Sequence, residues 1–314
     1  MDALSRLLTL YPLQTALDVR CQFGAPWLLD HPGTAAGTAP YHLIVSGSAV
    51  FDAGSHKGSA LSAGDIVVFP HGAPHRLYLG DPAHPAPAHE LPGEHLLRQV
   101  RNAGDGAATQ VLCGEFHFED QRSAALLAAL PEVLIVHTRG QPDAASLGQL
   151  MSLLQAETEA SRPGAAAIVG QLASALFALL IRAWMEQSAA LPGLFAVLAE
   201  RRLQPALQGM LAAPEKPWSL EDLAAACHMS RATFARLFKQ AANATPADVL
   251  AQLRMAQAAR LLEQGRQSVG SIAEAVGYQS EAAFNRAFKR QHGIGPGAYR
   301  SSRKGGGKAQ GSMS

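Results

Sequence analysis

The last third of the chain contains one pattern of residues twice, and this repeat constrains the fold more than any other feature. From Ser230 and Ser280 onward, the two copies keep a constant register of aromatic, cationic and proline residues. The matched pairs are Phe234 and Phe284, Arg236 and Arg286, Phe238 and Phe288, Lys239 and Lys289, and Pro246 and Pro296. Phenylalanines four residues apart share one face of a helix. Each copy therefore predicts a helix that buries aromatic side chains on one face and exposes cations on the other.

A shorter helix and a tight turn precede each of these helices. In the second copy, Ile272 and Val276 share a helix face, and Gly277 follows at the position where a left-handed residue usually ends a helix. His228 stands at the equivalent position of the first copy, whose turn is one residue shorter. The serines at 230 and 280 are expected to cap the longer helices. The sequence therefore predicts two helix-turn-helix motifs.

A third helix is expected to join the two motifs. Thr245-Pro246-Ala247-Asp248 has the residues of a helix start, and Gly265 those of a helix end. As one helix, residues 246–264 would be about 28 Å long at 1.5 Å per residue. Successive major-groove faces of DNA lie roughly 34 Å apart, so this helix could hold two recognition helices on one side of a duplex.

The exposed faces of the two recognition helices carry residue types suited to DNA, because Arg can bind guanine and Lys can bind phosphate. The residues expected to contact DNA are Arg231, Ala232, Ala235, Arg236, Lys239, Ala282, Ala283, Asn285, Arg286 and Lys289. Charge supports this interpretation. Residues 205–314 hold 14 Lys and Arg against 7 Asp and Glu, whereas residues 1–204 hold 12 against 18. The net charge of +1 thus combines a basic DNA-binding part with an acidic remainder.

The first part of the chain is expected to form short strands separated by Gly- and Ser-containing turns. The predicted strands are Tyr41–Ser46, Ser48–Phe51, Asp65–Phe69, His75–Leu79 and Thr109–Phe118. Residues 64–75 resemble the second cupin motif, Gly-x5-Pro-x-Gly-x2-His, although Leu79 stands where that motif has Asn. Of the first cupin motif, only His42 before Gly47 is present, without His-x-His or a following Glu. This predicts a cupin-like β-barrel and weighs against cupin enzyme chemistry.

The predicted fold class is therefore α+β with two domains. A cupin-like barrel with appended helices, at about 123–130, 146–160 and 165–187, forms residues 1–203, with a mobile insertion at 81–106. The remaining predicted segments are a linker at 204–217, an all-α domain with two helix-turn-helix motifs at 218–303, and a disordered tail at 304–314. Within the linker, the stretch around Leu203 to Leu211 could itself be helical.

Residues 219–300 resemble the DNA-binding domain of the AraC/XylS family of transcription regulators. The closing pattern Gly293-x-x-Pro296-x-x-Tyr299-Arg300 is part of that resemblance. The resemblance implies a sequence-specific regulator, an activator by our interpretation, with double-stranded operator DNA, RNA polymerase and a second copy of the chain as partners. The first eight residues, Cys21, Trp27 and Cys113-Gly114 resemble the branch of the family that responds to reactive chlorine species. That resemblance implies redox roles for the two cysteines.

Cys21, Cys113, His42 and His75 could also bind metal, since two thiols and two imidazoles suit tetrahedral zinc. Zinc is therefore the candidate cofactor. The alternatives are that the cysteines are small buried hydrophobes and that the histidines line an ordinary polar cavity. Cys227 falls on the inner face of a motif helix and is expected to serve packing only.

The chain is expected to be cytoplasmic and not bound to a membrane. Met1 to Arg6 has no basic start followed by an apolar run, and the apolar stretch 165–184 includes Gln171 and Arg182. Three cysteines without an export signal weigh against a disulfide framework. Two alternative functions remain open: a regulator of the same architecture that binds a small organic effector in the barrel, and a metal-dependent cupin enzyme fused to a DNA-binding module.

Overall fold

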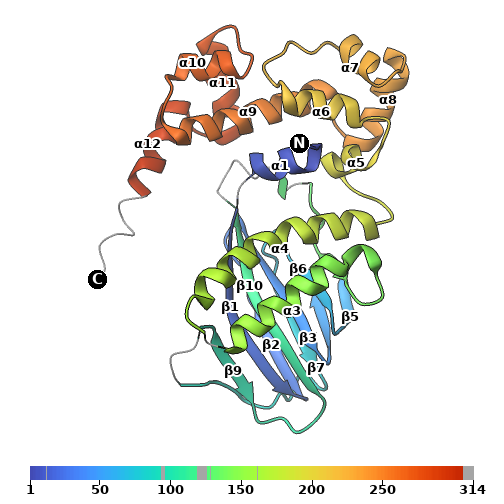
Figure 1. Ribbon diagram of the computed structural model, residues 1–314, viewed down its shortest axis with the longest axis vertical. Coiled ribbons are helices and arrows are strands. Elements are labelled where there is room, and N and C mark those ends of the chain that lie inside the picture. Colours follow the sequence, from blue (N-terminus) through green and yellow to red (C-terminus); the bar gives the residue numbers. More distant parts are fainter. Residues whose placement is uncertain (12, 93–95, 119–125, 128, 161, 307–314) are drawn as a thin grey trace. The chain divides into compact units, whose positions relative to one another are not determined.

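The computed structural model describes residues 1–11, 13–92, 96–118, 126–127, 129–160 and 162–306, and it divides into two compact units (Figure 1). The barrel unit comprises residues 13–119 and 130–189. The helical unit comprises residues 1–12, 120–129 and 190–314.

The described strands all belong to the barrel unit. They are β1 (Leu13–Gly24), β2 (Trp27–His31), β3 (Thr38–Ser46), β4 (Ser48–Ala53), β5 (His56–Ser62), β6 (Asp65–Val68), β7 (His75–Leu79), β8 (Ala88–Glu90), β9 (Arg98–Asn102), β10 (Ala108–Phe118) and β11 (Leu134–His137). Within the described residues they form a sheet of order β11-β6-β3-β10-β1-β9-β8 and a second of order β2-β7-β4-β5. Neighbouring strands are antiparallel, except that β9 runs parallel to β1.

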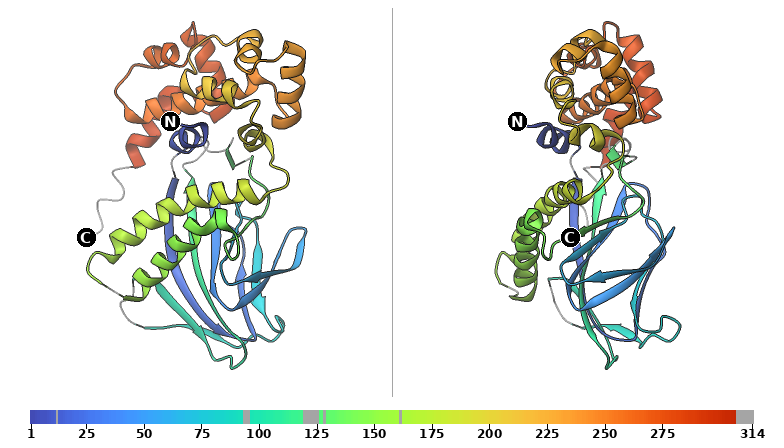
Figure 2. Two further views of the ribbon diagram at one scale, coloured as in Figure 1. Left: turned by 45° about the vertical axis from the view of Figure 1, so that its right-hand side comes forward. Right: turned by 90° about the vertical axis from the view of Figure 1, so that its right-hand side faces the viewer.

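Apolar side chains of both sheets fill the interior of the barrel, as the alternating strand pattern predicts. Trp27, Phe51, Phe69 and Leu77 are almost completely buried in this core. Helices α3 (Ala145–Ala160) and α4 (Ala165–Gln187) lie against the outer face of the larger sheet (Figure 2).

Helix α4 is long and apolar enough, by length and composition, to span a membrane. Its inner face instead packs on the sheet, where the Phe177 ring lies 5.1 Å from that of Phe116 and 5.4 Å from that of Phe118. Nine of its residues, from Ala165 to Trp184, are buried. Helix α4 is thus the buried helix that the sequence predicts over 165–187.

The five predicted strands lie within β3, β4, β6, β7 and β10, with Phe69 just beyond the end of β6. The stretch 81–106, predicted as a mobile insertion, forms two strands in its described part. These are β8 and β9. Strand β9 pairs with β1 in the larger sheet, and β8 pairs with β9 at the edge of that sheet. The helix predicted at about 123–130 lies mostly outside the described residues.

The helical unit has the predicted pair of helix-turn-helix motifs around a central helix. Within the described residues its helices are α1 (Ala3–Leu10), α5 (Gly193–Ala199), α6 (Gln204–Ala212), α7 (Leu220–Ala226), α8 (Arg231–Ala242), α9 (Pro246–Gln264), α10 (Val269–Ala275), α11 (Glu281–His292) and α12 (Pro296–Gly306). Helix α9 has the predicted bounds, begins at a capping box of Thr245 and Asp248, and ends at left-handed Gly265. It contacts α8 of the first motif and both helices of the second.

The boundaries between parts differ from those expected. Helix α6 occupies most of the predicted linker 204–217. Helix α5 packs against α8, and α1 packs against α6 and α9, so residues 190–203 and 1–12 group with the helical unit and not with the barrel. Helix α12 continues to Gly306, two residues past the start of the predicted tail. The rest of that tail, residues 307–314, lies outside the described residues.

Candidate functional site

The first motif consists of α7 and α8, and its local structure follows from polar caps. Ser219 and Asp222 form a capping box at the start of α7. At the start of α8, the backbone N–H of Thr233 donates to Oγ of Ser230 over 3.2 Å. His228 has a φ of 53°, which is the left-handed conformation expected at this turn.

The second motif, α10 and α11, repeats this construction. The N–H of Ala283 donates to Oγ of Ser280 over 3.2 Å, and Gly277 has a φ of 83°. Phe284 and Phe288 are fully buried together with apolar residues of α9 and α10. This burial fixes which face of α11 remains available to a ligand.

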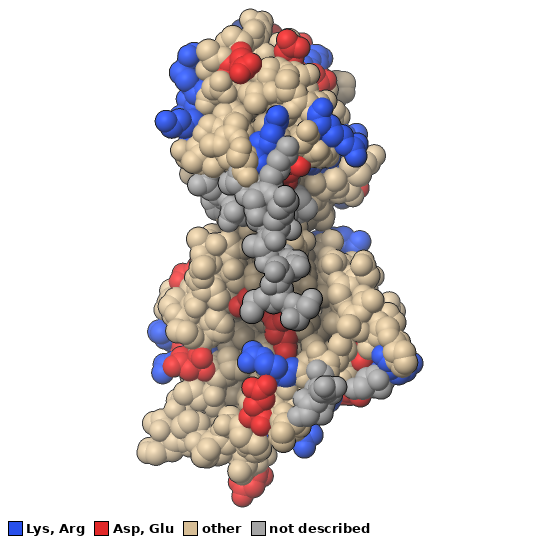
Figure 3. Space-filling model, turned by 90° about the vertical axis from the view of Figure 1, so that its left-hand side faces the viewer, with Lys and Arg blue, Asp and Glu red and all other residues tan. Residues whose placement is uncertain are grey.

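The faces of α8 and α11 opposite their phenylalanines are open to solvent. Of the residues expected to contact DNA, none is buried: seven are exposed, and Ala235, Ala283 and Asn285 are half-buried. Figure 3 shows Lys and Arg side chains at several points on the surface of the helical unit. Nη1 of Arg231 lies 2.6 Å from Oε1 of Glu221, so this arginine already has an acidic partner. Arg236 and Arg286 are the exposed guanidinium groups at matching positions of the two motifs.

Arg254 of α9 and Gly277 of the second motif both contact the segment before the first motif, which the sequence pattern did not reveal. Arg254, on α9, donates to the backbone oxygens of Pro214 and Lys216 over 2.7 and 3.0 Å. A Cβ atom at Gly277 would lie 2.5 Å from the Glu215 oxygen and 2.8 Å from Nη2 of Arg254. Glycine is therefore needed here for close approach as well as for its positive φ.

A cavity of about 630 Å³ lies between the two motifs. Its wall includes Ala235 and Lys239 of α8, Arg254 of α9, and Gln279 of the second turn. The two motifs therefore border one concave surface. The sequence pattern does not reveal this surface, because its residues come from segments that are far apart in the chain.

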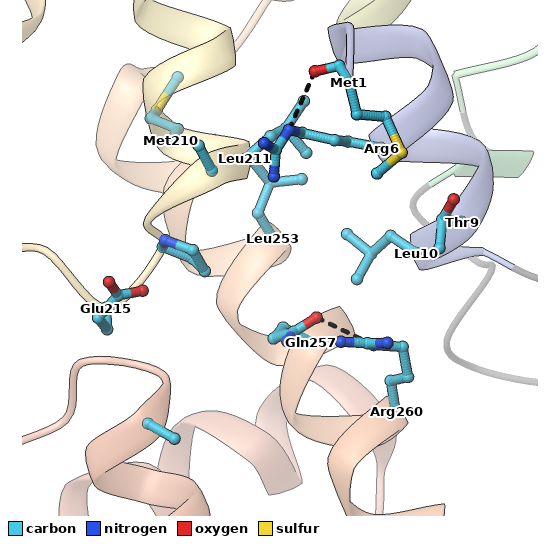
Figure 4. A pocket seen from close by; sticks show the side chains of 13 residues that line it. Met1, Arg6, Thr9, Leu10, Met210, Leu211, Glu215, Leu253, Gln257 and Arg260 are labelled. Atoms are coloured by element: carbon cyan, nitrogen blue, oxygen red, sulfur yellow. Dashed lines mark hydrogen bonds between the residues drawn. The ribbon is translucent and has the colours of Figure 1, made fainter.

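Helix α1 forms a second small cavity with α6 and α9, of about 290 Å³ (Figure 4). Leu10 and Leu253 point into it, and Arg6 and Arg260 lie at its edges. Nε of Arg6 donates to the Met1 oxygen over 3.3 Å. The start of the chain thus packs on the central helix of the DNA-binding unit.

In the barrel unit, three adjacent strands place Cys21, Cys113 and His42 side by side. Cys113 on β10 pairs directly with His42 on β3. On the other side, Cys21 of β1 pairs with Val111, two residues from Cys113, so the two cysteines are diagonal neighbours on one face. His75 comes from β7 of the opposite sheet. The structure therefore brings together all four residues that the sequence analysis selected.

A chain of hydrogen bonds links these residues and assigns their protons. Nδ1 of His75 lies 2.8 Å from the Ala73 oxygen, which can only accept, so Nδ1 of His75 donates. Nε2 of His75 then accepts from Nε2 of His42 over 2.8 Å. Nδ1 of His42, 3.0 Å from Sγ of Cys113, is left to accept the thiol proton.

The surroundings keep the imidazoles neutral and the thiol protonated. Burial lowers the pKa of His75 to about 4, with a smaller contribution from His31. Burial also holds the pKa of His42 well below its ordinary value, aided by His75 and His31. A hydrogen bond with Cys21, followed by burial, raises the pKa of the Cys113 thiol well above its ordinary value.

This arrangement does not suit the predicted four-ligand zinc site. The two ring nitrogens of His42 face different partners, Cys113 and His75, and one nitrogen binds a given metal ion. A single ion therefore cannot take Cys113, His42 and His75 together as these rings lie. In the described part of the chain, no three or more His, Cys, Asp and Glu side chains are grouped to hold a metal.

Cys21 and Cys113, the two cysteines of the barrel, differ in access. A cavity of about 250 Å³ is lined by Cys113, His42 and His31, with Asp18, Asp30, Glu115 and Arg98 among its other residues. Cys113 is half-buried, whereas Cys21 is 1% exposed and does not line this cavity. All three cysteines are free thiols. Cys227 is buried in the helical unit, at the end of α7.

Comparisons with known proteins agree with both units. Residues 2–186 match a family model described as Cupin, and residues 223–302 match one described as a helix-turn-helix domain. The chain is 32% identical to the "RCS-specific HTH-type transcriptional activator RclR" of Escherichia coli (strain K12), over 96% of this chain and 97% of that protein. It is also 32% identical to the "HTH-type transcriptional regulator MtrA" of Neisseria gonorrhoeae, over 96% and 98%.

Among solved structures, the DNA-binding domain of AdpA, in complex with a target DNA, covers 34% of this chain and 98% of its own. The identity is 34% and the TM-score 0.31. The two family models and the full-length relatives decide the assignment. The chain belongs to the AraC-type family of helix-turn-helix regulators with an N-terminal cupin domain, and it is a DNA-binding transcriptional regulator, not an enzyme.

Proposed function

We propose that this regulator activates transcription in response to reactive chlorine oxidants, through oxidation of Cys21 and Cys113 in its barrel. The observation that carries the proposal is the contact of these two free thiols with each other and with His42. Neighbouring thiols can form a reversible disulfide, which suits a sensor. The name of the E. coli relative, an RCS-specific activator, supports the choice of oxidant and the direction of control.

The state of the Cys113 thiol supports a strongly electrophilic oxidant. Thiolates, not thiols, are the common nucleophiles in cysteine oxidation. The raised pKa of Cys113 keeps it protonated at neutral pH, so oxidants that need a large thiolate population should react slowly. Hypochlorous acid is electrophilic enough to react with the little thiolate that forms.

The chain connection between β1 and α1 offers a route for the signal. Strand β1 carries Cys21 and begins at Leu13, and α1 ends at Leu10. Helix α1 packs on α6 and α9, and α9 contacts both DNA-binding motifs. A shift of β1 when the disulfide forms would pull on α1 and so alter α9.

The partners that we propose are double-stranded operator DNA, RNA polymerase and a second copy of the chain, all in the cytoplasm. Ile168, Leu172, Ala175 and Leu179 follow one another along α4 at helical spacing, and none of them is buried. Leu153 on the adjacent helix α3 is 54% exposed. Such an apolar stripe can pair with itself about a twofold axis, so we propose that it forms a homodimer interface.

The alternative function, binding of a small organic effector in the barrel, has less support. Packed side chains such as Trp27, Phe51 and Phe69 fill the barrel interior. The 250 Å³ cavity beside Cys113 is below the size of most ligand pockets. It is large enough for a small oxidant.

The test is in vitro transcription and operator binding with reduced and hypochlorous acid-treated protein. We expect activation by the oxidised wild type and by Cys227→Ser, and loss of activation in Cys21→Ser and Cys113→Ser. Equal activation by all four proteins would exclude a thiol switch, and activation by a ligand without any oxidant would favour the effector alternative.

A further inference from the structure

We propose that Cys113 is the thiol that the oxidant attacks first, that His42 accepts its proton, and that Cys21 is the second thiol, which closes the disulfide. This inference rests on the proposed function, because it assigns separate roles to the two sensor cysteines. It also gives His42 and His75 a use that does not involve a metal ion.

Access separates the two thiols. Cys113 lines the 250 Å³ cavity, and Cys21 lies behind it at 1% exposure, on the neighbouring strand. A small neutral oxidant that enters this cavity therefore meets Sγ of Cys113 before that of Cys21. The acidic residues Asp18, Asp30 and Glu115 in the wall disfavour the hypochlorite anion relative to neutral hypochlorous acid.

The contact with His42 is the second difference between the two thiols, after access. Its Nδ1 atom lies 3.0 Å from Sγ of Cys113 and has no proton of its own, because Nε2 of the same ring donates to His75. The Ala73 oxygen holds His75 in the matching tautomer. Phe69 stacks on the His75 ring with centroids 3.6 Å apart and keeps it in place. The backbone thus leaves Nδ1 of His42 as an acceptor 3.0 Å from Sγ of Cys113, to which the thiol proton can turn from Cys21, its other hydrogen-bond partner.

The first step leaves chlorine on Cys113. The sulfur attacks the chlorine of hypochlorous acid, an S–Cl bond forms and the Cl–O bond breaks. Hydroxide leaves, and the thiol proton passes through Nδ1 of His42 to this hydroxide, which becomes water. In this step the sulfur is oxidised by two electrons, and the chlorine is reduced by the same two electrons, formally from +1 in hypochlorous acid to −1 in the S–Cl bond.

The second step forms the disulfide. The Cys21 sulfur attacks the chlorinated sulfur of Cys113, the S–S bond forms, and chloride leaves while the Cys21 proton passes to solvent. In total, two thiols and one hypochlorous acid give one disulfide, one water, one chloride and one proton. Diagonal neighbours across an antiparallel pair lie roughly 7–8 Å apart, near the limit of disulfide geometry, so closure requires β1 and β10 to shift.

The decisive experiment measures oxidation cysteine by cysteine in the full-length reduced protein. The protein receives half an equivalent of hypochlorous acid, is quenched within seconds and alkylated, and each cysteine is quantified by mass spectrometry. In Cys21→Ser, Cys113 should be oxidised within about twofold of the wild-type rate and should become trappable by dimedone. In Cys113→Ser, oxidation of Cys21 should be at least tenfold slower. Cys227→Ser is the control and should change neither rate.

The reverse order would overturn the inference: Cys21 oxidised at the wild-type rate without Cys113, and Cys113 protected by Cys21→Ser. This outcome would leave the disulfide and the transcriptional response intact, so it is distinguishable from failure of the proposed function. That function fails only if oxidation of the pair has no effect on transcription.

The role of His42 has its own test. We expect His42→Gln to slow oxidation of Cys113 by tenfold or more, in line with the usual contribution of a positioned base. His71→Gln is the matched control, because His71 donates to a backbone oxygen elsewhere in the same barrel. An unchanged rate in His42→Gln, with an unchanged near-ultraviolet circular dichroism spectrum, would exclude the proton-acceptor role. Stoichiometric zinc that is lost from both His42→Gln and Cys113→Ser would show that the histidines serve a metal instead.

Discussion

His42 lies directly opposite Cys113 in the antiparallel pair of β3 and β10, with its Nδ1 atom 3.0 Å from the cysteine Sγ. The same ring reaches across to the second sheet, where its Nε2 atom is 2.8 Å from that of His75. One imidazole therefore connects the Cys113 thiol to both sheets of the barrel. This arrangement has a measurable consequence for stability.

The stability of the barrel should depend on pH through His75. Its pKa is lowered from 6.5 to about 4 in the folded state, so between these values the unfolded chain binds a proton that the folded chain does not. Stability should therefore fall as pH drops from 6.5 towards 4, by up to about 3 kcal/mol for this residue. Urea unfolding across this range should show the loss. The loss of stability should be smaller in His75→Gln than in the wild type. It should equal the wild-type loss in His84→Gln, which alters an exposed histidine. An equal slope in all three proteins would contradict the assignment.

Gly277 and His228 occupy equivalent turns and should respond oppositely to substitution. Gly277→Ala would place a Cβ against the Glu215 oxygen and the Arg254 guanidinium at a φ of 83°. We expect a loss of about 1–3 kcal/mol in unfolding free energy. His228→Gly removes a side chain from a left-handed position, so it should be neutral or stabilising. Thermal unfolding of both variants and of the wild type measures the two changes in stability. Equal losses would show that backbone conformation does not limit these turns.

The DNA-binding unit should need residues before the predicted boundary at 204. Phe195 on α5 is fully buried, and α5 packs against α8. A fragment of residues 190–303 should therefore unfold at a higher temperature than one of residues 205–303, and it should bind the operator more tightly. Calorimetry and a gel-shift titration of the two fragments provide the comparison. If the shorter fragment is as stable as the longer one, α5 is not part of this unit in function.

The exposed stripe on α3 and α4 should hold two chains together. Leu153→Asp or Ile168→Asp would place a charge in that interface, and sedimentation should show a shift from dimer to monomer. Lys57→Asp, at an exposed polar position of β5 in the other sheet, is the control. If both apolar variants remain dimeric, the interface lies elsewhere.

The helical unit could be predicted in detail because its signals are local. The serine caps, the left-handed residues at 228 and 277, and the bounds of α9 depend on neighbours within a few residues. By contrast, α1 joins the helical unit through contacts with α6, about 200 residues away in sequence. Periodicity carries no information about such a partner.

In the barrel, the sequence indicated which residues lie close together but not which hydrogen bonds they form. Cys21, His42, His75 and Cys113 come from four strands, and the zinc expectation followed from their residue types alone. The direction of each imidazole depends on the Ala73 oxygen and on strand register, which set hydrogen bonds that composition does not specify. Strands β8 and β9 were missed because Pro, Gly and His dominate their surroundings.

Footprinting of Arg236→Ala and Arg286→Ala tests most directly whether the two motifs read one operator together. Each exposed arginine stands at the same position of its own recognition helix, so each loss should weaken binding by about 1–3 kcal/mol. We expect the two variants to lose protection at separate half-sites about one helical turn apart. Loss of protection at the same base pairs in both variants would contradict this expectation.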